Sequence, residues 1–118
     1  MVRRIGGLAP GLTVAQFDVY ANPHAASRHS VPYLVDVQSP LIDALNTRLV
    51  MPLSRVGVGQ ARLPVSLCPT IEIDGEPLSL MPHLAAPLPA RMLSDPMANV
   101  SHLASEIVGA MDAVVSGF

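Results

Sequence analysis

The stretch TIEIDGEPLSL, residues 70–80, constrains the fold of this chain more than any other. Two short runs of alternating apolar residues flank Asp74–Gly75, a dipeptide typical of the tight turns that join antiparallel strands. We therefore predict a hairpin in which Thr70–Ile73 pairs with Glu76–Leu80. This prediction makes a β-sheet the starting point for the rest of the chain.

Three segments before the hairpin also alternate between apolar and polar residues, the pattern of strands with one buried face. The first two strands are expected at residues 16–20 (QFDVY) and 32–39 (PYLVDVQS), with a polar loop between them. The third is expected at residues 47–59 (TRLVMPLSRVGVG). Because proline has no N–H to donate to a neighbouring strand, Pro52 predicts that this third strand is at an edge or bulged.

Asp36 is the most informative carboxylate in these strands. Its neighbours Val35 and Val37 fall on one face of the expected strand, so the alternation places Asp36 on the opposite face. We expect this carboxylate either to be solvated or to be held by one of the arginines.

The segment after the hairpin changes from strand to helix patterning. Three prolines between Pro82 and Pro89 exclude a long helix there, and a short strand is expected around residues 90–93. A helix is expected over residues 101–115, with the Ser101 hydroxyl as its cap and Asp95–Pro96 as an alternative start. Its apolar residues recur at spacings of three and four: Leu103, Ile107, Ala110, Met111 and Val114.

This order of elements predicts a mainly β fold, a small barrel or sheet with a C-terminal helix packed on it. A length of 118 residues fits one domain, which we place at residues 15–118. Half of the residues are hydrophobic and only 14% are charged, so we expect some apolar surface to meet another subunit. Residues 1–14 are expected to be an extension, either disordered or foreign to the native chain.

The charged residues disfavour direct binding to nucleic acid. The formal net charge is −2, and the seven basic residues are arginines scattered along the chain, with no cluster apart from Arg3–Arg4. No stretch reaches the roughly 18 uncharged apolar residues that a membrane helix needs. The single cysteine, Cys68, excludes an intrachain disulfide and fits a reducing cytoplasm, and its apolar surroundings predict a buried packing position.

Motifs that carry chemistry are lacking in this sequence. The four histidines and the cysteine do not have metal-site spacing, and neither a phosphate-binding loop nor a hydrolase elbow is present. Ser101, His102 and Glu106 could be assigned as nucleophile, base and orienting acid, but the cap and first turn of a helix explain them better. We therefore predict no catalytic, cofactor-binding or metal-binding residues.

Five segments, in order and with compatible spacing, resemble the CcdB family of toxins from toxin–antitoxin modules. The resemblance extends from Gln16 to the end of the chain. The segments are QFDVY (16–20), LVDVQSPLID (34–43), RLVMPL (48–53), CPTIEIDGE (68–76) and ANVSHLASEI (98–107).

The resemblance implies an SH3-like barrel with a small extra sheet and a C-terminal helix, assembled as a two-fold homodimer. It implies a plasmid-maintenance type of toxin that binds the DNA gyrase A subunit and traps the enzyme with its DNA cleaved. Such a toxin is not an enzyme and needs no cofactor. It is neutralised by a cognate antitoxin, whose disordered segment becomes ordered on the toxin surface.

The resemblance also implies a gyrase-binding end at Ser116, Gly117 and Phe118, where the family has Trp-Gly-Ile. Serine replaces the tryptophan, and truncating an interface tryptophan commonly costs about 2 kcal/mol, or about thirtyfold in affinity. A family member that binds antitoxin but poisons gyrase weakly or not at all is therefore an alternative. A second alternative is an endoribonuclease toxin, since other toxin families share the barrel type.

Overall fold

A computed structural model describes residues 15–40, 46–55 and 67–117. The expected extension at residues 1–14 and the end of the expected third strand, residues 56–59, lie outside this part of the chain.

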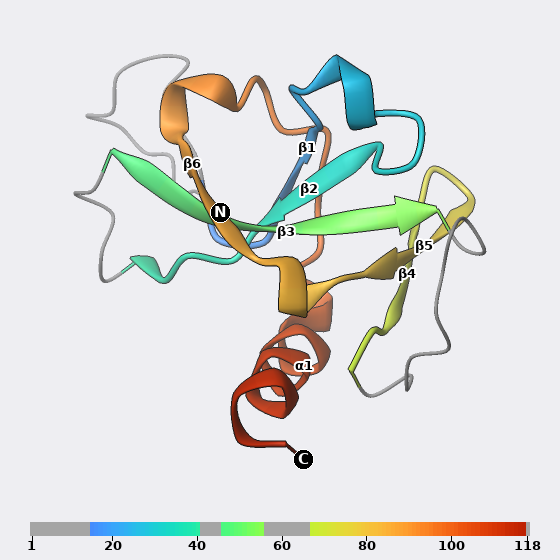
Figure 1. Cartoon of the computed structure of the whole chain (residues 1–118), viewed down its shortest axis with the longest axis vertical. Helices are drawn as coiled ribbons and strands as arrows, with labels where there is room; N and C mark the ends of the chain where they lie inside the picture. Colours follow the sequence, from blue (N-terminus) through green and yellow to red (C-terminus); the bar gives the residue numbers. More distant parts are fainter. Residues whose placement is uncertain (1–14, 41–45, 56–66, 118) are drawn as a thin grey trace.

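Figure 1 shows a strongly twisted sheet, with the helix α1 projecting from one end. The strands are β1 (Asp18–Ala21), β2 (Tyr33–Asp36), β3 (Thr47–Arg55), β4 (Thr70–Ile73), β5 (Glu76–Leu80), β6 (Ala86–Pro89) and β7 (Ala98–Asn99). Within these residues the helices are α1 (Ala104–Ser116) and the short 3₁₀ turns η1 (Ala25–Ser27), η3 (Pro82–Leu84), η4 (Ala90–Met92) and η5 (Ser101–Leu103).

All strands pair in an antiparallel manner in the order β4-β5-β3-β2-β1-β7, and β6 also pairs with β3. The sheet forms a nearly closed barrel, which confirms the predicted mainly β fold with a C-terminal helix. The predicted hairpin is confirmed to the residue, with Ile73 opposite Glu76. Asp74 and Gly75 have φ values of 52° and 79°, as expected of a turn that matches the twist of its strands.

The edge position predicted for the third strand is wrong, because β3 pairs with β2 on one side and with β5 and β6 on the other. Val37 N donates to Leu49 O across β2 and β3, so the alternation of the ladder turns the Pro52 nitrogen away from β2. On that other side β6 pairs with Thr47–Val50, and β5 pairs only from Leu53 onward. Pro52 therefore lies at the junction of two partner strands, where no ladder donor is needed.

The strand predicted around residues 90–93 is also wrong: Ala90–Met92 is the turn η4, and the strand is β6, four residues earlier. The prolines of this segment exclude a long helix, as predicted, but they do not prevent a strand. Ala90 N donates to Asn46 O on the β3 side, so alternation turns the nitrogens of Pro87 and Pro89 away from β3. An edge strand accepts proline at such positions.

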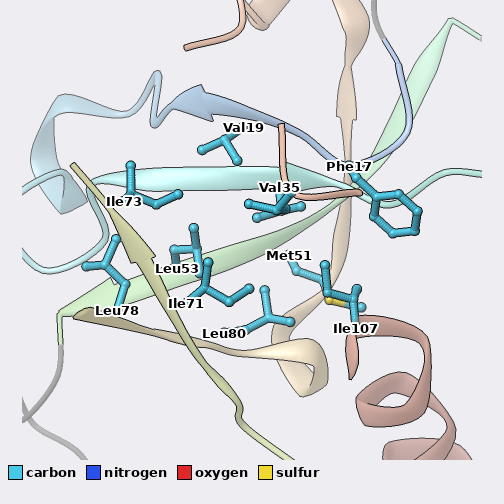
Figure 2. Close-up of a cluster of buried hydrophobic side chains, with 11 residues drawn as sticks. Phe17, Val19, Val35, Met51, Leu53, Ile71, Ile73, Leu78, Leu80 and Ile107 are labelled. Atoms are coloured by element: carbon cyan, nitrogen blue, oxygen red, sulfur yellow. The ribbon is translucent and has the colours of Figure 1, made fainter. Parts of the chain in front are cut away.

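The two faces of the sheet bury different clusters. The larger cluster, shown in Figure 2, has hairpin side chains at one end and Ile107 of α1 at the other. The smaller cluster, on the opposite face, consists of Tyr20, Leu34, Val50 and Leu93. The larger cluster consists of Phe17, Val19, Val35, Met51, Leu53, Ile71, Ile73, Leu78, Leu80, Val100 and Ile107.

The predicted helix is present, but its predicted cap is wrong. Ser101 lies in η5, three residues before α1, and α1 has no side-chain cap at its N-terminus. Asn99 Oδ1 instead accepts a hydrogen bond of 2.9 Å from Ser101 N. The alternative start at Asp95–Pro96 also lies outside any helix. The chain enters α1 through a 3₁₀ turn, which moves the start of the helix beyond the reach of the serine.

Candidate partner-binding surface

The candidate site is the exposed side and tip of α1. Only Ile107 and Ala110 of this helix are buried. Val108 and Val115, seven residues apart and hence on one side of the helix, are 50% and 81% exposed. Apolar side chains exposed together in this way are typical of a surface that meets another macromolecule.

An apolar hollow adjoins this side of the helix. It has a volume of about 130 Å³ and lies between α1 and the face of the sheet that carries the larger cluster. Val108 lines the hollow and is also half exposed, so the hollow and the exposed side of α1 form one continuous surface. The lining residues are Phe17, Val37, Leu49, Met51, Ile107, Val108, Met111 and Asp112.

The tip of α1 lies at Ser116 and Gly117, one residue beyond the predicted end of the helix. Gly117 has a φ of 83° in the left-handed region, and its N–H donates to Ala113 O at 2.9 Å, which closes the last turn. Ser116 and Gly117 are both exposed at this tip, at the far end of the helix from the barrel (Figure 1). Phe118, the third predicted site residue, lies outside the described residues.

The Ser116 side chain bonds to its own helix. Its hydroxyl donates to the Asp112 carbonyl at 2.7 Å, one turn earlier. Ser116 therefore places a short polar group against the helix, at the position that the resemblance matches to a tryptophan.

Asp36, expected to be solvated or paired with an arginine, is fully buried and paired with Arg48. Arg48 Nε lies 2.7 Å from Asp36 Oδ2 and Arg48 Nη2 lies 3.2 Å from Oδ1, so the pair is bidentate. The Gln38 N–H also donates to Asp36 Oδ1, at 3.0 Å. Burial raises the pKa of Asp36, and the hydrogen bonds from Arg48 and Gln38 oppose this shift. The pair links β2 to β3 on the face of the sheet opposite the hollow.

A second buried carboxylate, Asp18, lies on the same face of the sheet. It accepts hydrogen bonds from Asn99 Nδ2 at 2.8 Å and from the Ala15 N–H at 3.1 Å. Tyr20, two residues along β1, is fully buried, and its hydroxyl has no hydrogen-bond partner within residues 15–40, 46–55 and 67–117. Sequence reasoning did not single out Tyr20 or Arg48, because the registers of β1, β2 and β3 are what place both on the face of Asp36.

Replacing Tyr20 with phenylalanine is expected to leave stability at pH 7 unchanged or slightly higher, because the lost hydroxyl has no partner among the described residues. Burial and the charges of Asp18 and Asp36 raise the pKa of Tyr20. Above about pH 10 the unfolded chain releases a phenol proton that the folded chain keeps, so stability falls by about 1.4 kcal/mol per pH unit. Urea denaturation from about pH 9 to pH 11 should show this loss in the wild type and in the Tyr33→Phe control, which keeps Tyr20. A Tyr20→Phe protein with the same loss would contradict the assignment.

The structure gives no support to a catalytic set at the start of α1. Ser101, His102 and Glu106 are all exposed, and within the described part of the chain no side-chain hydrogen bond joins any two of them. Cys68 is buried, as predicted from its neighbours. Among the described residues, no three His, Cys, Asp or Glu side chains are grouped as metal ligands, and no helix is long and apolar enough to cross a membrane.

The nearly closed barrel and its single projecting helix define a mostly β protein whose candidate site is an exposed surface. The family model described as CcdB protein matches residues 16–117, nearly the whole chain, and the chain belongs to the CcdB family. This is the family of toxin–antitoxin toxins that act on gyrase. The match confirms the resemblance that the five sequence segments indicate.

Proposed function

We propose that this protein is the toxin of a type II toxin–antitoxin module, acting in the cytoplasm on DNA gyrase. It binds the gyrase A subunit through the tip of α1, traps the complex with its DNA cleaved, and is neutralised by a cognate antitoxin. The observation that carries the proposal is the family match over residues 16–117, together with Ser116 and Gly117 exposed at the projecting end of α1. Binding alone accounts for this activity, without a chemical step on the toxin.

The proposed toxin acts as a homodimer. Val108 and Val115 expose apolar surface along one side of α1, and the hollow beside Val108 extends that surface onto the sheet. A second copy related by a two-fold axis would cover the same surface on both subunits. The proposed dimer accounts for the high apolar content of this small chain.

The test is a gyrase cleavage assay with the purified full-length protein, supercoiled DNA and ATP. We expect linear DNA to accumulate as the protein is added, and prior addition of the cognate antitoxin to suppress it. Absence of cleaved DNA even at high protein concentration would reject gyrase poisoning. Incubation of the same sample with RNA tests the endoribonuclease alternative, for which RNA cleavage is the required outcome.

A second candidate function is supported by the bond between the Ser116 hydroxyl and Asp112 O. A tip that presents serine instead of a large aromatic ring offers gyrase less contact area, which favours a family member that binds antitoxin with weak or no gyrase poisoning. Expression without the antitoxin separates the two candidates. Growth arrest supports the toxin, and normal growth at verified protein levels supports the antitoxin-binding protein.

A further inference from the structure

Three soft donor atoms meet at the open end of the β4–β5 hairpin, far along the strands from the Asp74–Gly75 turn. Cys68 precedes β4 and Met81 follows β5, and the Leu80 N–H donates to Pro69 O at 2.9 Å, which holds the two ends together. Cys68 Sγ lies 4.0 Å from Met81 Sδ and 3.9 Å from Nδ1 of His83 in η3. The Cys68 thiol therefore lies against both a thioether and an imidazole, and the three groups come from the two ends of the hairpin.

The two sulfur-containing side chains are buried, and the imidazole is exposed. Cys68 and Met81 are 8% and 5% exposed, whereas His83 is exposed. The sulfurs are therefore shielded from water, and the imidazole lies on the side from which an ion could enter.

The two separations measured from Cys68 Sγ match those expected between ligands of a single ion. First-row ions bind thiolate sulfur at about 2.3 Å and imidazole nitrogen at about 2.0 Å. In a trigonal arrangement these bond lengths place two sulfurs about 4.0 Å apart, and a sulfur and a nitrogen about 3.7 Å apart. The observed distances of 4.0 and 3.9 Å require almost no movement of the donors.

We propose that Cys68, Met81 and His83 form a site for one Cu(I) ion. Thiolate and thioether ligands select Cu(I) over harder ions, and imidazole also suits copper. Zinc is bound by Cys, His, Asp and Glu side chains, and within the described part of the chain no third side chain of these types joins Cys68 and His83. The third donor here is the Met81 thioether, which disfavours zinc. Binding forms a Cu–S bond and releases the thiol proton to solvent, with no change in oxidation state.

The test uses the full-length protein, Cu(I) kept reduced with ascorbate under anaerobic conditions, and competition with a chromogenic Cu(I) chelator. We expect one copper per chain, together with an ultraviolet thiolate-to-copper band that is easily seen because the chain has no tryptophan. The melting temperature should also rise, since the ion joins both ends of the hairpin. A stoichiometry other than one, or equally tight binding of Zn²⁺ in a parallel titration, would overturn the proposal.

Variants of the three donors separate this site from adventitious binding. Cys68→Ala should abolish the band. Met81→Leu, a swap of similar volume, and His83→Gln should each weaken binding at least about tenfold, because even residues that only orient a metal ligand contribute about 10- to 100-fold. Met97→Leu and His102→Gln are the matched controls at exposed positions and should bind as the wild type does. Wild-type affinity in a folded Met81→Leu protein, with folding checked by circular dichroism, would rule out the three-donor site.

Discussion

Replacing Asp36 with asparagine is expected to lower the free energy of unfolding by about 3–5 kcal/mol, the usual cost of removing one partner of a buried ion pair. The Arg48 guanidinium would keep its charge at a position where its side chain is only 2% exposed, without the carboxylate that faces it. A domain of this size has roughly 5–15 kcal/mol of stability, so the variant should lose a large part of it. Urea denaturation at pH 7, followed by circular dichroism, measures the difference.

The matched control is Glu76→Gln, which makes the same chemical change at an exposed pair. Glu76 Oε2 lies 3.0 Å from Arg55 Nε, and these side chains are 38% and 35% exposed. An exposed pair contributes about 0–1 kcal/mol, so this variant should be nearly as stable as the wild type. Equal losses of unfolding free energy in Asp36→Asn and Glu76→Gln would show that burial does not increase the contribution of the Asp36–Arg48 pair.

The double variant Asp36→Leu/Arg48→Met separates the contribution of the pair from the cost of an unpaired charge. Apolar residues of similar volume remove both charges together, and buried pairs replaced in this way often lose little stability. We expect the double variant to be more stable than Asp36→Leu or Arg48→Met alone, with a coupling energy of about 2–3 kcal/mol between the two positions. A double variant that loses the sum of the two single losses would mean that the two side chains contribute independently.

Strand alternation predicts which face of the sheet each residue occupies, but it does not identify the partner of Asp36. The period of two is a local property of the chain, so it places Asp36 on the face opposite Val35 and Val37 without any knowledge of the neighbouring strands. The pairing with Arg48 depends on the register between β2 and β3, which sets Asp36 opposite Val50 and brings Arg48 within reach. With seven arginines in the chain, only that register distinguishes Arg48 from the others.

The prolines were misinterpreted for the same physical reason. Whether a proline breaks a strand depends on the direction of its nitrogen, and that direction depends on which neighbour the strand pairs with. Pro52 has its nitrogen at the junction between β5 and β6, and Pro87 has its nitrogen turned away from β3. Neither direction is visible in the local sequence, so a central strand was placed at an edge and an edge strand was missed.

The candidate surface was predictable in part. The helical period placed the end of α1 within one residue, because that signal is local. The exposure of Val108 and Val115 was not predictable, since it depends on how far α1 projects beyond the sheet it packs against. The Cys68, Met81 and His83 group was missed because its members are brought together by the hairpin and the turn after it.

Replacing Ser116 with tryptophan is expected to lower the protein concentration needed for half-maximal gyrase-mediated DNA cleavage by about thirtyfold, which corresponds to about 2 kcal/mol of restored contact. Ser116 is exposed and its hydroxyl bonds only to the preceding turn of its own helix, so the larger ring displaces nothing in the described part of the domain. The matched control is Ser105→Trp, which adds the same ring at an exposed position in the first turn of α1 and should not increase cleavage. No gain from Ser116→Trp, in a wild type that does poison gyrase, would place the main contact elsewhere. In that case Phe118→Ala is the next variant, and a loss of cleavage in it would identify the terminal phenylalanine as the anchor.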